Sequence, residues 1–163
     1  MQMAAVHNRW VIPASILAGL FLSVMPLPEA LVWLRPQFTA LIFIYWCLTF
    51  PHRVGVITAW LVGISVDIVT HSVLGQHALA LVVVAYICLL SYQRIRTYLF
   101  WQQSMWVFIM IGIQQLFINW VHSLNGHSAA PSQFLLPALS SALLWPLVHT
   151  LLERLKIRYR VSL

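Results

Sequence analysis

The chain has 163 residues, of which 61% are hydrophobic and only 7% are charged, and its mean hydropathy is +0.87. Soluble domains typically carry about 25% charged residues, so this composition excludes a water-soluble fold with an ordinary surface. The sequence therefore predicts an integral membrane protein. At about 20 apolar residues per spanning helix, the length allows about six spans and no large extramembrane domain.

Charged and turn-forming residues divide the chain into six apolar runs, each of which predicts a transmembrane helix. The predicted spans are residues 10–27, 36–50, 54–70, 78–92, 98–121 and 134–152, followed by a basic tail at 153–163. The first run could instead be a signal peptide. We disfavour this alternative because its apolar core exceeds the 7–15 residues typical of such peptides, and no small-residue cleavage site follows.

The distribution of basic residues predicts the orientation of this all-α bundle. With both chain ends in the cytoplasm, Arg35 is the one basic residue outside. The other eight lie inside, namely Arg9, Arg53, Arg94, Arg96, Arg154, Lys156, Arg158 and Arg160. Cytoplasmic loops of membrane proteins are enriched in Lys and Arg, so we expect six spans with cytoplasmic N- and C-termini.

The sequence lacks the residue patterns of several function classes. Its net charge of +6 comes from residues between and after apolar runs, which indicates membrane topology and not nucleic-acid binding. Neither an H-E-x-x-H pair nor a Ser-His-Asp arrangement is present, and the seven histidines form no cluster with the spacing of metal ligands. We therefore expect no catalytic residue, no metal site and no cofactor.

Asp67 is the one acidic residue within a predicted span. It lies 14 residues beyond Arg53, or roughly 21 Å along a helix, which places it toward the outer side of the membrane. Gly63 and His71 lie one turn away on the same face. Asp67 could cap or orient the polar stretch that follows it, or it could form a buried polar pocket or a partner contact.

Polar residues on the fifth span lie at the same predicted depth as Asp67. Gln115, Asn119 and His122 recur at helical spacing on that span. Two polar stripes at matched depth predict either a hydrogen-bonded contact between helices three and five, which we favour, or a small cavity open to the outside. Arg35 is also expected outside, and we consider an ion pair between Arg35 and Asp67.

Several short motifs resemble those of the rod shape-determining MreD family of Gram-negative bacteria. They occur in the same order along nearly the whole chain: Arg35-Pro36-Gln37-Phe38, Tyr45-Trp46, Pro51-His52-Arg53-Val54, Gly63-Ile64-Ser65-Val66-Asp67, Leu74-Gly75 and Leu144-Trp145-Pro146. The resemblance implies a non-enzymatic subunit of the machinery that elongates the cell wall. It also implies a helical bundle similar to the substrate-binding subunit of energy-coupling-factor vitamin transporters.

The resemblance implies partners as well: the bitopic periplasmic protein MreC, the actin-like filament MreB, and the glycan polymerase RodA with its transpeptidase. A membrane scaffold for these proteins is our leading hypothesis, and a vitamin-like small-molecule binding subunit of a transporter is the alternative. The residues expected to contact a partner or line a polar pocket are Arg35, Pro36, Gly63, Asp67, Gly75, Gln115 and Asn119. Gly63 could equally pack within the fold.

Overall fold

The computed structural model describes residues 10–26, 28–126, 131–159 and 161. These residues form six α-helices and one 3-10 helix, with no strand among them, which confirms the predicted all-α class. The elements are α1 (Val11–Val24), η1 (Glu29–Leu34), α2 (Phe38–Thr49), α3 (Val56–Thr70), α4 (Gln76–Ile95), α5 (Phe100–Leu124) and α6 (Pro131–Arg158).

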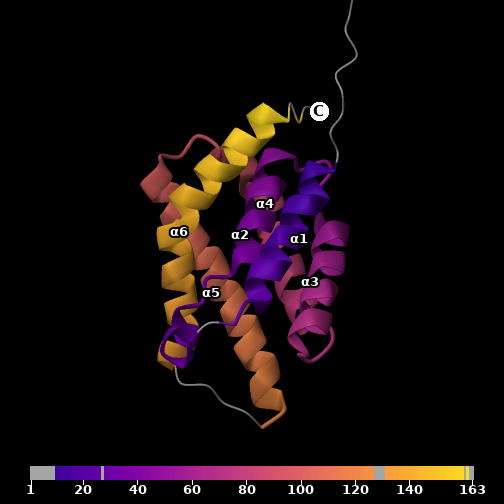
Figure 1. Cartoon of the computed structure of the whole chain (residues 1–163), viewed down its shortest axis with the longest axis vertical. Coiled ribbons are helices and arrows are strands. Elements are labelled where there is room, and N and C mark those ends of the chain that lie inside the picture. The colour runs from indigo at the N-terminus through magenta and orange to yellow at the C-terminus, as the bar shows by residue number, and fades with distance from the viewer. Residues whose placement is uncertain (1–9, 27, 127–130, 160, 162–163) are drawn as a thin grey trace, which may run out of the picture.

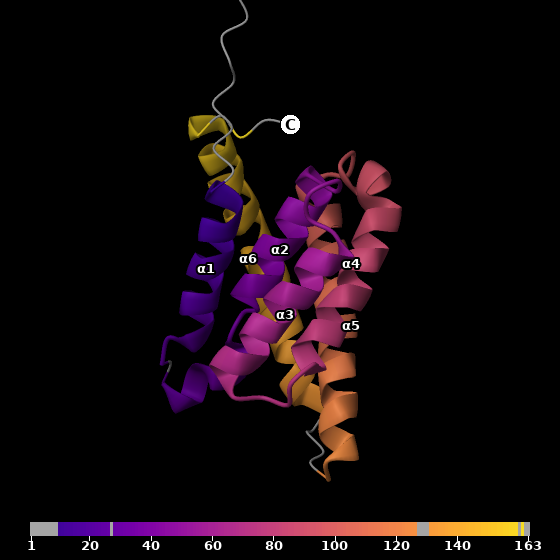
Figure 2. The same ribbon diagram turned by 90° about the vertical axis from the view of Figure 1, so that its right-hand side faces the viewer.

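Successive helices run up and down through one bundle (Figure 1). The start of α1 and the end of α6 lie at one end, with the α4–α5 connection beside them (Figure 2). We call this the Arg96 end. The α3–α4 connection and η1 lie at the opposite end, which we call the Asp67 end. Because the number of α-helices is even, α1 begins and α6 ends at the same end of the bundle, the Arg96 end.

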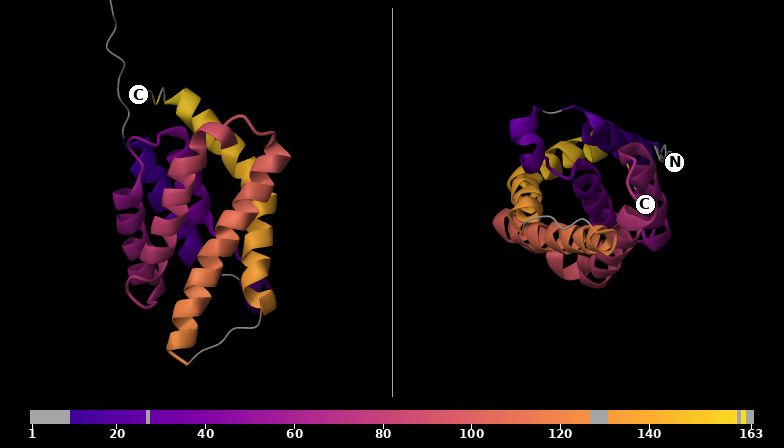
Figure 3. Two further views of the ribbon diagram at one scale, coloured as in Figure 1. Left: turned by 180° about the vertical axis from the view of Figure 1, so that it is seen from behind. Right: turned by 90° about the horizontal axis from the view of Figure 1, so that it is seen from below.

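Helix α2 is the centre of the bundle. It packs against α1, α4 and α6, and the view along the bundle shows the other helices around it (Figure 3). Every residue from Thr39 to Leu48 is buried, which suits a helix that carries no charge and is mostly apolar on all faces. Its polar atoms bond to neighbouring helices. Trp46 Nε1 donates to Ser15 Oγ of α1 at 2.7 Å, and Tyr45 Oη donates to Glu153 of α6 at 2.6 Å.

The outer surface of the bundle is rich in exposed apolar side chains. Examples on four different helices are Phe21, Ile57, Trp101 and Leu143, each more than 60% exposed. Such a surface suits contact with lipid and not with water. By length and composition, α4, α5 and the segment Leu135–Arg158 of α6 can each cross a membrane. Helices α1, α2 and α3 are apolar but shorter.

Several helix boundaries differ from the predicted spans. Helix α4 extends beyond 78–92 at both ends, and α6 continues through Arg158, so the first six residues of the predicted tail are helical. Lys and Arg can occupy the last turn of a helix because their long side chains carry the charge away from the apolar surface. The 3-10 helix η1 was not anticipated by the sequence analysis, although it falls between the first two predicted spans.

Candidate functional site

Asp67, near the end of α3, is the centre of a hydrogen-bond network at the Asp67 end. Its Oδ1 accepts bonds from Ser72 Oγ at 2.8 Å and from the backbone N–H of His77 at 3.0 Å, and it lies 2.8 Å from His77 Nδ1. Its Oδ2 accepts a bond from the backbone N–H of Gly75 at 2.8 Å. Asp67 is only 1% exposed. We call Asp67, Ser72, Gly75 and His77 the Asp67 network.

The Asp67 network explains how an acid is tolerated in this apolar helix. Gly75 and His77 flank the first residue of α4, where backbone N–H groups have no partner within their own helix. A carboxylate at a helix N-terminus satisfies these donors and interacts favourably with the helix dipole. Of the two roles that the sequence left open for Asp67, these hydrogen bonds support capping of the polar stretch that follows it. Gly75 enables this geometry because its φ of +94° suits a residue without a side chain.

Gly63 sets the close approach of α3 to α4 that this cap requires. A Cβ atom on Gly63 would lie 2.2 Å from Ala78 Cα and 2.6 Å from Ala78 N, both of which are backbone atoms of α4. No side chain fits between these helices at this point. Gly63 therefore packs within the fold one turn before Asp67.

Arg35 does not pair with Asp67, so that hypothesis was wrong. Its guanidinium Nη2 donates to the backbone oxygens of Met25 at 3.0 Å and Leu22 at 3.5 Å, at the C-terminal end of α1. Carbonyl groups in the last turn of a helix lack partners in their own helix and attract cations. Arg35 thus links the start of α2 to the end of α1, and the side chain that lies against the Asp67 carboxylate is His77, with its Nδ1 2.8 Å from Oδ1. The neighbouring Pro36 accepts a bond from Phe38 N.

One residue of the predicted polar stripe on α5, His122, contacts α4. Gln76, the first residue of α4, lies with its Nε2 3.0 Å from His122 Nε2. The predicted direct contact between helices three and five was therefore wrong, because α4 packs between them. Gln115 is buried on the same helix. The buried Oδ1 of Asn119 has no hydrogen-bond partner among the described residues.

A small polar cavity of about 120 Å³ lies inside the bundle at the Asp67 end. It is lined by Ser23, Arg35, Pro36, Gln37, Thr39, Ala40, Val66, Thr70, His77, Leu81 and Gln114. We call it the Gln114 cavity, because Gln114 is 2% exposed and its Oε1 has no partner in the described part of the chain. Its volume equals about four water molecules at roughly 30 Å³ each.

The predicted pocket residues and the cavity coincide only in part. Arg35 and Pro36 line the Gln114 cavity, whereas Asp67, Gln115 and Asn119 do not. His77 and Gln114 were not among the predicted site residues. His77 could have been found from its position two residues after a glycine at a helix start, where a side chain is close to the capping acid. Typical ligand pockets measure about 300–1,000 Å³, so the cavity suits water better than a vitamin.

Comparison with known proteins assigns this bundle to a family. A family model described as rod shape-determining protein MreD matches residues 5–155. The chain belongs to the MreD family. The rod shape-determining protein MreD of Haemophilus influenzae is 31% identical over 163 residues, which cover 100% of this chain and 99% of that protein. No solved structure matches the chain.

MreD membership is consistent with the chemistry of the site. The family is described as one of rod shape-determining proteins. Within the described ranges, no group of three His, Cys, Asp or Glu residues is arranged to hold a metal ion. Cys47 and Cys88 are free and fully buried. In this MreD-family chain, the polar residues at the Asp67 end bond chiefly to one another, which favours a structural role for them.

Proposed function

We propose that the chain is a non-enzymatic scaffold of the cell-wall elongation machinery, with six spans in the bacterial inner membrane and both termini in the cytoplasm. Its expected partners are MreC, MreB and RodA with its transpeptidase. The observation that carries the proposal is the MreD family match over residues 5–155, together with the relative named for rod-shape determination.

The charge distribution supports the proposed orientation. At the Arg96 end lie the basic residues Arg53, Arg94, Arg96, Arg154, Lys156 and Arg158, whereas Arg35 lies at the Asp67 end. Arg9 and Arg160, which the topology prediction also used, fall outside the described residues. The preference of basic residues for the cytoplasmic side makes the Arg96 end the cytoplasmic one.

The exposed apolar surface supports a scaffolding role. Helices in a bilayer associate through close packing and a few hydrogen bonds, because lipid is as apolar as the side chains. The described loops are short, so the lipid-embedded helix faces offer most of the surface to a partner. The alternative of a transport subunit receives less support, because the Gln114 cavity is small and five of the seven predicted site residues do not line it.

Cysteine crosslinking to co-expressed MreC tests this proposal. Single cysteines at exposed positions on different helices should crosslink along one face only; suitable positions are Leu17, Ile57, Leu90, Trp120 and Leu143. Positions 115 and 119 complete the scan, whereas positions 63 and 67 are omitted because a side chain at Gly63 would clash with Ala78 and loss of Asp67 would leave the start of α4 without its cap. Cysteines at the fully buried Val84 and Ala85 are matched negative controls. The native Cys47 and Cys88 can remain, because both are buried.

The crosslinking result should agree with cell shape. In a rod-shaped bacterium depleted of its own copy, wild-type protein should restore rods. A bulky polar substitution on the crosslinked face should give round cells although the protein level stays normal. Failure of every position to crosslink to MreC would argue against scaffolding of that partner. Normal rods after depletion would argue against any role in cell shape.

A further inference from the structure

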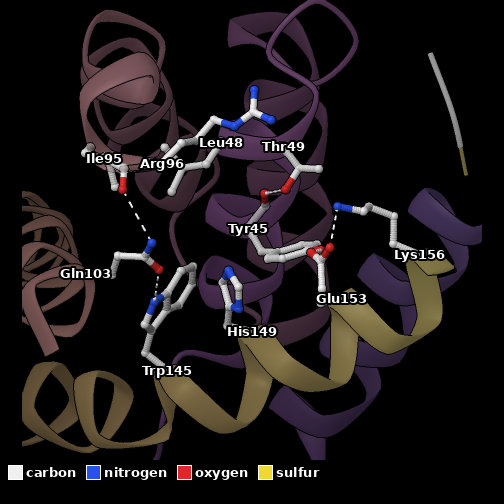
Figure 4. Close-up of a pocket in the computed structure, with 10 residues that line it drawn as sticks. All are labelled: Tyr45, Leu48, Thr49, Ile95, Arg96, Gln103, Trp145, His149, Glu153 and Lys156. Atoms are coloured by element: carbon white, nitrogen blue, oxygen red, sulfur yellow. Dashed lines mark hydrogen bonds and ion pairs between the residues drawn. The ribbon is translucent and has the colours of Figure 1, made fainter. Parts of the chain in front are cut away.

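A second pocket, unrelated to the Asp67 network, lies at the Arg96 end of the bundle. It has a volume of about 240 Å³ and is formed by α2, α6 and the α4–α5 connection (Figure 4). We call it the Tyr45 pocket. Its lining residues are Tyr45, Leu48, Thr49, Ile95, Arg96, Gln103, Trp145, His149, Glu153 and Lys156. Its volume equals about eight water molecules, twice that of the Gln114 cavity.

Aromatic rings fixed by hydrogen bonds form one wall of the Tyr45 pocket. Trp145 is fully buried, and its Nε1 donates to Gln103 Oε1 at 3.3 Å. The ring of His149 packs edge-on against Tyr45, with centroids 5.3 Å apart, and lies 5.8 Å from the ring of Trp145. The buried Nδ1 of His149 has no hydrogen-bond partner among the described residues. The wall is therefore ordered and retains one unused polar atom.

The charges of the Tyr45 pocket do not balance. Lys156 Nζ lies 2.6 Å from Glu153 Oε1, and Tyr45 Oη donates to Glu153 Oε2 at 2.6 Å. Glu153 is thus neutralised by Lys156. Arg96 also lines the pocket and is exposed, and it has no ion pair with any described residue. One guanidinium group, with its planar set of N–H donors, remains available to an anion.

The surroundings of the Tyr45 pocket favour an anion as well. Among the described residues at the Arg96 end, six are basic and Glu153 is the one acid. Guanidinium groups match the geometry of phosphate oxygens. In a bilayer, phosphates of lipid headgroups lie at the ends of spanning helices, and basic pockets between such helices bind anionic headgroups.

We propose that the Tyr45 pocket binds the phosphate headgroup of an anionic phospholipid. Arg96 contacts the phosphate, and the aromatic wall packs against the glycerol. This inference requires no protein partner, so it can hold even where scaffolding of MreC fails.

Retention of lipid during purification tests the inference. The full-length chain is extracted from vesicles containing equal amounts of phosphatidylglycerol and phosphatidylcholine, and bound lipid is measured by native mass spectrometry. The variants Arg96→Gln and Arg94→Gln are a matched pair: both arginines are exposed and lie two residues apart, but only Arg96 lines the pocket. We expect a roughly fivefold loss of phosphatidylglycerol retention for Arg96→Gln. Arg94→Gln should retain nearly the wild-type amount.

Three outcomes would overturn the proposal. Equal losses in the two variants would show general surface attraction and no site. Displacement of the lipid by micromolar glycerol 3-phosphate would indicate a soluble phosphate ester as the ligand. Binding of an acidic hexapeptide that depends on Arg96, with lipid retention unchanged, would assign the pocket to a protein partner. Thermal unfolding of both variants verifies that any loss does not come from misfolding.

Discussion

The tight crossing of α3 and α4 predicts a large effect of a single methyl group. In Gly63→Ala the new Cβ would lie 2.2 Å from Ala78 Cα, whereas carbon atoms in contact are ordinarily about 3.5–4.0 Å apart. The helices must therefore separate by about 1.3 Å or more. A shift of that size would lengthen the 2.8 Å bond from Gly75 N to Asp67 beyond hydrogen-bond range.

The magnitude follows from these two effects. Overpacking costs about 1–3 kcal/mol, and a hydrogen bond to a charged group contributes about 1.5–3 kcal/mol. We expect Gly63→Ala to lower the free energy of unfolding by about 3 kcal/mol or more. Unfolding of the purified protein by SDS in mild-detergent micelles, followed by tryptophan fluorescence, measures this difference.

Two control variants sharpen the prediction. A Cβ on Gly112, within α5, would meet no atom within 4 Å, so Gly112→Ala should be neutral or stabilise by up to about 1 kcal/mol. Ala78→Gly should not rescue Gly63→Ala, because the clash involves backbone atoms of residue 78. Wild-type stability of Gly63→Ala, or its rescue by Ala78→Gly, would refute the close approach of the two backbones.

Three further predictions use the same unfolding assay. Asp67→Ala should lower the free energy of unfolding by about 3 kcal/mol, because it leaves backbone donors at the start of α4 unpaired. The control Glu29→Ala should change this free energy little, because Glu29 is exposed. Equal effects of the two substitutions would contradict the capping role. Gly75→Ala should cost about 1–2 kcal/mol because of the positive φ, and no loss would indicate a different turn. Tyr45→Phe should cost about 1.5–3 kcal/mol, and Glu153→Ala should cost less in that variant than in wild type; additive losses would exclude their coupling.

The sequence identified the important polar residue but not all of its partners. Asp67 was recognised because an acid in an apolar helix is costly, but its role was left open between capping the polar stretch after it and forming a polar pocket or partner contact. The predicted ion pair between Asp67 and Arg35 was wrong, because charge and depth in the membrane do not predict which side of the bundle a side chain lies on. Arg35 instead reaches the end of α1, which is its neighbour in the chain. His77, by contrast, lies only 10 positions after Asp67, so it could have been identified from the sequence as a partner of Asp67.

Contacts between distant segments were beyond sequence reasoning. The hydrogen bond between Tyr45 and Glu153 joins residues 108 positions apart, and the bond from Gln37 N to Ser141 Oγ joins residues 104 apart. Hydropathy predicts where helices lie along the chain, but it does not predict which helices are neighbours. The mistaken contact between helices three and five has the same origin, because α4 packs between them.

The distribution of polar groups also determines how genetic results should be interpreted. Asp67 and Gly63 face α4 inside the fold, so their substitution disturbs the bundle before it disturbs a partner. Loss of rod shape in an Asp67 variant would therefore report on folding. Ile57 and Trp60 of α3 are exposed, and their side chains make no contribution to the Asp67 network. A shape defect at these positions with unchanged unfolding would locate a partner surface, since effects on folding and on binding can be separated at exposed positions.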